Sequence, residues 1–294
     1  MWDKMKMLLA WLLPAKSIFI LTILLVGCNS PIISPTVKLT ETRSSTETIL
    51  APQTFTPSPS ATNIPTSTIT PTPGTVLCSP LEGISLAELP TLMTGDTFRP
   101  PLPGRDDGHH GIDFAFYRHG TLTTMLGLPI QAIMMGKVAA VITNLKPYGN
   151  AIIIETSLDT IPAGWADTIK LPTPAPTVIP DPRLTCPKPQ PEPWMTAGRR
   201  ALYHLYAHMN KPSPLKVGDT VACGQVIGEV GTSGSSVNLH LHLETRLGPA
   251  STTFTSLGHY DTLTTEEERS NYCTWRVSGW FQMFDPMLLL SQTP

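Results

Sequence analysis

Leucine and polar residues alternate strictly from Val237 to Glu244, which is the period of a strand with one buried face. The pattern predicts that the leucines point into a core and that His240, His242 and Glu244 point out of the opposite face. Two imidazoles that lie two residues apart on one strand face are able to share a metal ion. The alternative is a surface strand with two incidental histidines.

Short apolar runs of similar length recur along the chain between Gly- and Pro-rich turns. They predict strands at 112–116, 128–132, 136–142, 151–155, 203–209 and 224–231. Short strands separated by turns indicate an antiparallel β domain. We therefore expect a mainly β fold, with a single antiparallel, sandwich-like β-sheet domain and long irregular insertions.

Helix signals are few in this sequence. One helical turn is expected at 85–89, ended by Pro90. A second helix is expected to start at Thr265, because Glu268 completes a capping-box pattern with it.

The first 28 residues have the pattern of an export signal. Lys4, Lys6 and Lys16 precede an apolar run at 17–26, and no uninterrupted apolar stretch of about 20 residues is present. The run ends at Cys28, preceded by a glycine, in a pattern that resembles the bacterial lipobox. That resemblance implies cleavage before the cysteine and a lipid anchor in the membrane. The alternative is an uncleaved anchor, and in both cases the rest of the chain lies outside the cytoplasm.

Composition divides the remainder of the chain into a stalk and a folded domain. Residues 29–74 are dominated by Ser, Thr and Pro, and such a segment buries too little apolar surface to offset its ordering entropy. We expect a disordered stalk there and a folded domain at 75–294. Within that domain, 157–198 and 249–283 break the strand pattern and are expected to be insertions. The net charge of -2 gives no reason to expect nucleic acid as a partner.

A Gly-rich polar loop leads into the strand predicted at 112–116 and brings together two types of metal ligand. His109 at the end of the loop and Asp113 on the polar face of the strand are expected to converge on one point. Zinc readily accepts imidazole nitrogen and carboxylate oxygen. The neighbouring His110 leaves the identity of the first histidine open, although the spacing to Asp113 favours His109. The alternative is a polar surface turn.

The strand predicted at 203–209 carries two more histidines. In a strand, His204, Tyr206 and His208 share a face. His204 and His208 also have the spacing of a helical zinc pair, but Leu205 stands where H-E-x-x-H requires its glutamate. We expect His204 to be a structural or groove-lining residue.

Taken in order, these motifs resemble the lysostaphin/LytM-type zinc endopeptidases, which cleave bacterial peptidoglycan cross-links. The resemblance runs from about Gly95 to Leu247. It rests on H-x-x-x-D at 109–113, Y-x-H at 206–208, H-x-H at 240–242, and a run at 217–228 similar to the family's VGD-V-x-x-G-Q-x-I-G. The segment at 285–288 looks like the closing segment of the family.

The resemblance implies a specific site and activity. One zinc ion would be held by His109, Asp113 and His242, and His208 and His240 would form the catalytic pair. Three protein ligands leave a fourth position for water. The implied function is cleavage of peptidoglycan peptide bonds in cell-wall remodelling or lysis. The alternative is a non-catalytic lipoprotein that binds peptidoglycan or activates other cell-wall enzymes, since some relatives have lost ligands; the presence of all five positions favours the enzyme.

The cysteines and aromatic residues of the domain indicate how the insertions are held. Four cysteines remain once Cys28 is lipidated, and an even number in an exported domain predicts two disulfides, with three connectivities open: Cys78, Cys186, Cys223 and Cys273. Five aromatic residues in the second insertion either wall the groove or, more often in such segments, form a satellite core: Tyr260, Tyr272, Trp275, Trp280 and Phe281.

Overall fold

A computed structural model describes residues 76–94, 97–173, 175, 179–187 and 198–292. These residues all lie within one compact unit, Ile64–Pro294. The export signal, Cys28 and the stalk predicted at 29–74 lie outside the described residues. Among the helices of the described ranges, none has the length and apolar character needed to cross a membrane.

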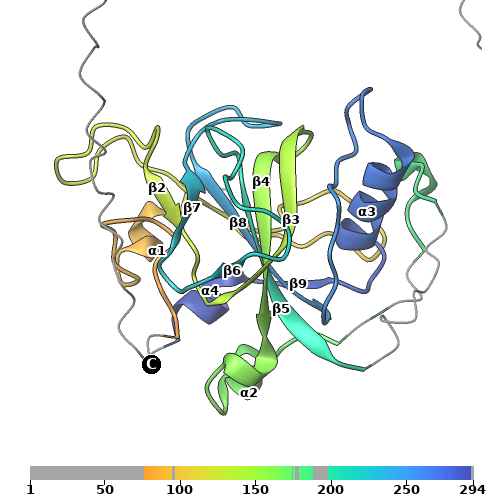
Figure 1. The fold of residues 1–294 in the computed structure, drawn as a ribbon, viewed down its shortest axis with the longest axis horizontal. Helices are drawn as coiled ribbons and strands as arrows, with labels where there is room; N and C mark the ends of the chain where they lie inside the picture. The colour runs from red at the N-terminus through yellow and green to blue at the C-terminus, as the bar shows by residue number, and fades with distance from the viewer. Residues whose placement is uncertain (1–75, 95–96, 174, 176–178, 188–197, 293–294) are drawn as a thin grey trace, which may run out of the picture. The chain divides into compact units, whose positions relative to one another are not determined.

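Most of the regular structure is β-strand, and the helices are short (Figure 1). The strands are β1 (Ile112–Phe114), β2 (Pro129–Gln131), β3 (Gly136–Leu145), β4 (Gly149–Ser157), β5 (Arg200–Ala207), β6 (Thr220–Val221), β7 (Val226–Glu229), β8 (Leu241–Pro249) and β9 (Gln282–Phe284). The helices are α1 (Leu89–Leu92), α2 (Trp165–Ile169), α3 (Glu266–Arg276) and α4 (Pro286–Leu290), with 3-10 turns at Leu158–Thr160 and Pro182–Leu184.

The strands form one large curled sheet and one small ribbon. The large sheet has the order β1-β8-β5-β4-β3-β6, and β9 pairs with the far end of β8. The ribbon consists of β2 and β7. All of these pairs are antiparallel. The predicted class, a mainly β fold built on an antiparallel sheet, is confirmed.

The large sheet is buried on both faces, because successive residues of a strand point to opposite sides. In β5, Leu202 and Tyr206 belong to a first core, which includes Leu81 and other residues of the segment before β1. Tyr203 and Leu205 belong to a second core. Figure 1 shows α1, β2 and β7 on one side of the sheet and α3 on the other.

The second insertion packs against one face of the sheet and completes the second core. Its aromatic residues Tyr272, Trp275 and Phe281 are buried there, and Trp280 packs against it. The expectation of a satellite core therefore describes these four residues. Tyr260 is the exception, with 53% of its surface exposed.

Two local predictions were wrong at their boundaries. Pro90 lies in the first turn of α1 rather than ending a helix, since a proline there gives up an N–H that the helix does not use. The strand predicted from Val237 begins as β8 at Leu241, after a single bridge between His240 and Gly231. The capping box at Thr265 is confirmed: its side chain accepts from the Glu268 amide, and the Glu268 carboxylate accepts from the Thr265 amide.

Two disulfides are present, as predicted, and the structure selects one of the three connectivities. Cys78 pairs with Cys223, and Cys186 pairs with Cys273. The second bond joins the first insertion to α3 in the second insertion. The two insertions are therefore covalently connected.

Candidate functional site

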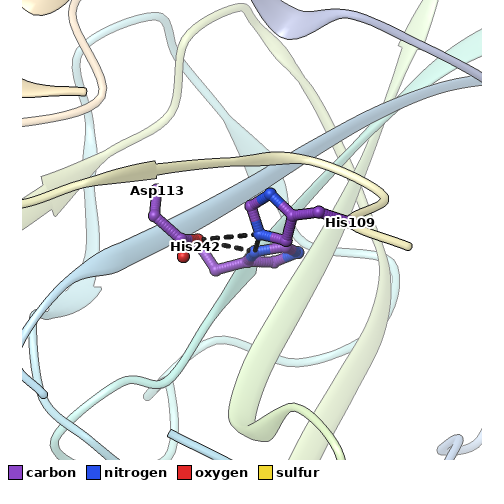
Figure 2. A group of neighbouring side chains, drawn as sticks. All are labelled: His109, Asp113 and His242. Atoms are coloured by element: carbon purple, nitrogen blue, oxygen red, sulfur yellow. Dashed lines mark hydrogen bonds and ion pairs between the residues drawn. The ribbon is translucent and has the colours of Figure 1, made fainter. Parts of the chain in front are cut away.

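Two neighbouring strands bring the three expected metal ligands together. Asp113 on β1 and His242 on β8 are direct cross-strand partners, so their side chains point to the same face. His109 lies on the loop that enters β1. Figure 2 shows the three side chains converging. The Nε2 atom of His109 lies 3.2 Å from Oδ1 of Asp113 and 3.1 Å from Nδ1 of His242, and Nδ1 of His242 lies 2.9 Å from Oδ1 of Asp113.

The outer nitrogen of each imidazole in this group has its own acceptor. Nδ1 of His109 donates to the Thr97 carbonyl oxygen at 3.1 Å, and Nε2 of His242 donates to Oε1 of Glu244 at 3.3 Å. With those protons placed outward, the inner nitrogens carry lone pairs. Three electron-rich atoms therefore face one another across about 3 Å, an arrangement that requires a cation or a proton between them.

The donor set fits a zinc ion. Zinc–ligand distances of about 2.0–2.1 Å in a tetrahedron correspond to ligand–ligand distances of roughly 3.3 Å, close to those observed. Within the described ranges, His109, Asp113 and His242 are the group of metal-binding side chains that meets this geometry. The three side chains are 8–13% exposed, so a fourth coordination position can be reached from solvent.

The electrostatics of the group favour a positive charge. Burial lowers the pKa of His242, but hydrogen bonds to Asp113 and Glu244 outweigh it and raise that pKa to about 9. Burial likewise opposes ionisation of Asp113, but hydrogen bonds from His109 and His242 hold its pKa below the ordinary value. The cluster therefore retains a proton at neutral pH unless another cation replaces it.

His110 does not share this position. Its Nδ1 accepts from Nη2 of Arg246 at 2.8 Å, and the side chain is fully buried. Burial, followed by the nearby Arg276 and Arg246, lowers the pKa of His110 far below its usual value. Of the two adjacent histidines, His109 is the one beside Asp113.

The two histidines expected to be catalytic lie beside the group. The rings of His208 and His240 are 4.8 Å apart, and the His208 ring lies 5.8 Å from that of His242. Nδ1 of His208 donates to the Ser233 carbonyl oxygen at 2.8 Å, and Nδ1 of His240 donates to that of Asn238 at 2.9 Å. Both rings therefore have Nε2 available for the site.

His208 reaches this site because the strand ends before it. Ala207 is the cross-strand partner of His242, whereas His204 pairs with Thr245 on the opposite face. Continued alternation would place His208 with His204, but His208 has a left-handed φ of +61° and its side chain turns back to the site. The prediction that His204, Tyr206 and His208 share a face was wrong for this reason. His204 is buried away from the groove.

Two glycines bring the support of His208 into place. Gly149, the first residue of β4, has a φ of +70°, and a Cβ on it would lie 2.3 Å from the backbone of Ser233. A Cβ on Gly234 would lie 2.3 Å from the Gly149 amide nitrogen. The two backbones pack this closely only because neither residue has a side chain. The contact fixes the loop that contains Ser233, whose carbonyl oxygen accepts the hydrogen bond from Nδ1 of His208.

Burial, followed by the neighbouring His242 and His240, lowers the pKa of His208 to about 3. His208 is therefore neutral at physiological pH. The histidines open into a pocket of about 550 Å³, which is also lined by Tyr148 and Arg276.

Glu244, for which the sequence predicts no role, lies directly behind His242. Glu244 is fully buried, and it accepts from Tyr148 at 2.7 Å and from Arg246 at 2.8 and 2.9 Å in addition to His242. Burial raises the pKa of Glu244, but Arg246 and the other donors hold it well below its usual value. An ionised carboxylate in this position orients a ligating imidazole. The signal was the strand period, which places residues 242 and 244 on one face.

One family model matches the segment from β5 to β8. Residues 195–253 match the model of peptidase family M23. This M23 match contains His208, His240 and His242, whereas His109 and Asp113 lie upstream of it. It confirms the resemblance to lysostaphin/LytM-type peptidases and supports a hydrolase that acts on peptide bonds. No curated protein matches the chain.

Several solved structures of peptidases are similar to this chain. The catalytic domain of lysostaphin from Staphylococcus simulans is 20% identical, over 71% of this chain and 98% of that chain, with a TM-score of 0.38. The catalytic domain of a mutant of the prophage-encoded M23 protein EnpA from Enterococcus faecalis is 26% identical over 56% and 87%, with a TM-score of 0.30. A zinc-containing peptidase from Vibrio cholerae is 21% identical over 52% and 31%, with a TM-score of 0.28.

Proposed function

We propose that this chain is a zinc-dependent endopeptidase that cleaves the peptide cross-links of bacterial peptidoglycan, in cell-wall remodelling or lysis. The observation that carries the proposal is the convergence of the inner donor atoms of His109, Asp113 and His242 within about 3 Å of one another. The M23 match supports it independently.

In this proposal the three residues hold one zinc ion. When bound, zinc supplies the Lewis acidity that polarises a carbonyl and lowers the pKa of water to about 7. Glu244 holds the His242 ring in the tautomer that presents Nδ1 to the metal. The Thr97 carbonyl oxygen likewise holds the His109 ring in the tautomer that presents Nε2 to the metal.

His208 and His240 are the proposed acid–base pair. Each donates Nδ1–H to a backbone carbonyl, so that the ring is held and Nε2 faces the pocket. A neutral Nε2 can take a proton from the attacking water and later deliver it to the leaving amine. Two adjacent imidazoles also offer a donor to the developing oxyanion once one of them is protonated.

The sequence patterns before the domain support a location of this activity at the cell surface. We propose that residues 1–28 direct export, that Cys28 carries the lipid anchor, and that 29–74 act as a stalk for the domain at 75–294. The protein would then be extracytoplasmic and membrane-anchored. Peptidoglycan would be its main partner, with other cell-wall enzymes as further partners and no role for nucleic acid.

The test is made on the full chain purified in detergent. We expect about one zinc per chain at neutral pH, and chelator-sensitive release of new amino groups from purified sacculi. His242→Ala should lose both, whereas His119→Ala, which removes a surface histidine that contacts Glu88, should keep both. A zinc-loaded chain that releases no amino groups would support the non-catalytic alternative, and absence of bound zinc would contradict the site.

A further inference from the structure

One side chain from the second insertion connects the supports of two metal ligands. Arg276, the last residue of α3, donates from Nε to Oδ1 of Asp106 at 2.6 Å. It also donates from Nη1 to Oε1 of Glu244 at 3.2 Å and to the Tyr148 hydroxyl at 3.0 Å. Asp106 lies on the loop that carries His109, and Glu244 contacts His242.

The contacts of Arg276 are shielded from solvent. The side chains of Asp106, Glu244 and Arg276 are 3%, 0% and 10% exposed. In such surroundings charge-assisted hydrogen bonds are strong and weakly screened by salt. The guanidinium stands between two carboxylates from segments that are far apart in the sequence, so it opposes their mutual repulsion as well as linking them.

The same insertion supplies two further hydrogen-bond donors to Asp106. The hydroxyls of Tyr260 and Tyr272 both donate to Oδ2 of Asp106, while Arg276 takes Oδ1. Cys273 on α3 is in turn bonded to Cys186 of the first insertion. The loop before β1 is therefore attached to the second insertion through one carboxylate, which accepts from three side chains of that insertion.

We propose that Arg276 is a positioning residue for the metal centre, which sets the separation of His109 and His242 by joining Asp106 to Glu244. The proposal rests on the zinc site of the proposed function. It gives the second insertion a role in metal binding, in addition to its packing in the second core. A guanidinium offers several donors in a fixed plane and reaches both carboxylates at once, whereas an ammonium at the end of a lysine is a single point charge.

The experiment compares Arg276→Gln and Arg276→Lys with wild type in the full chain. Zinc affinity is measured by competition with a chromophoric chelator, and the ligand field is measured by visible absorption of the Co(II)-loaded protein. We expect Arg276→Gln to lower zinc affinity by roughly 10–100-fold and to alter the Co(II) band, as losses of outer-shell partners typically do. Arg276→Lys keeps the positive charge but lacks the planar set of donors, so its zinc affinity should lie between those of Arg276→Gln and wild type.

The matched control is Arg269→Gln on the same helix, since Arg269 donates to the Thr264 carbonyl oxygen rather than to either carboxylate. It should leave zinc affinity and the Co(II) band unchanged. Unchanged affinity and an unchanged band in a folded Arg276→Gln protein would overturn the proposal. If that variant does not fold, the same result in Arg276→Lys would overturn it. Zinc binding without cleavage of sacculi would contradict the proposed peptidase activity and leave this proposal intact.

Discussion

The carboxylate of Asp113 and the imidazole of His242 face each other across the β1–β8 pair, with Oδ1 and Nδ1 2.9 Å apart. The two residues are separated by 129 positions in the chain, so the contact depends on strand register. A shift of one residue would move His242 to the opposite face of the sheet and replace it with a leucine. The proposed metal site therefore depends on this strand pairing.

Replacing the carboxylate should weaken metal binding most directly. We expect Asp113→Asn to lower zinc affinity by more than the roughly 10–100-fold typical of outer-shell changes, because a neutral amide replaces a charged ligand. Zinc competition titrations measure the effect. Asp107→Asn is the control, since Asp107 is an exposed partner of Arg105 on the same loop. Equal affinities in the two variants would contradict the ligand assignment.

Substitutions in the proposed catalytic pair should lower cleavage without loss of zinc, unlike substitutions of the proposed ligands. His208→Gln and His240→Gln are expected to retain stoichiometric zinc and to lower cleavage by roughly 10²–10⁴-fold, the usual contribution of a general acid or base. Metal analysis and amino-group release from sacculi are measured on the same samples. Loss of zinc from either variant would instead make that histidine a ligand.

Zinc should stabilise the folded state. At free zinc about 1,000 times the dissociation constant, the free energy of unfolding should rise by about 4 kcal/mol relative to chelator-treated protein. Urea unfolding with and without a chelator measures this difference. His242→Ala should unfold at the same urea concentration under both conditions. A chelator effect that persists in this variant would point to another zinc site.

Acid should destabilise the domain partly through His204. Burial lowers the pKa of His204 to about 3, whereas an unfolded histidine has a pKa near ~6.5. Between these values the unfolded state binds the extra proton, so stability falls as the pH drops below about 6.5, by up to about 1.4 kcal/mol per pH unit. Above pH 6.5 this contribution is constant.

His204→Leu should remove that pH dependence. Neither ring nitrogen of His204 has a hydrogen-bond partner among the described residues, so an apolar side chain should also raise stability at pH 7 by about 1–3 kcal/mol. Urea unfolding at pH 7 and pH 4.5 measures both effects. An unchanged difference between the two pH values would show that His204 is not the group that titrates.

The bond between the insertions should stabilise the domain. Replacing Cys186 and Cys273 by serine is expected to lower the free energy of unfolding by about 2–5 kcal/mol, with the upper part of this range favoured by the separation of 87 residues between the two cysteines. Replacing Cys78 and Cys223 provides the comparison. If Arg276 positions the metal ligands, the Cys186–Cys273 double variant should also lose zinc affinity, and the Cys78–Cys223 variant should not.

The sequence by itself determined the local features of this protein. Short apolar runs between Gly- and Pro-rich turns located most of the strands, because burial and turn preferences act on neighbouring residues along the chain. The capping box at Thr265 depends on residues three positions apart and was equally readable. The motifs around His109, Asp113 and His242 were sufficient to nominate a zinc site, since their residue types and order carry the resemblance to the M23 peptidases.

The tertiary structure decided the features that depend on distant residues or on unusual backbone conformations. His208 leaves the strand period with a left-handed backbone, whose N–H donates to the Tyr148 carbonyl oxygen, while its ring Nδ1 donates to the Ser233 carbonyl oxygen. The contact of Glu244 with His242 and the position of Arg276 between two carboxylates both depend on strand pairing and on the packing of the second insertion. Local periodicity contains no information about such contacts, because they are set by sheet register and core packing over the whole domain.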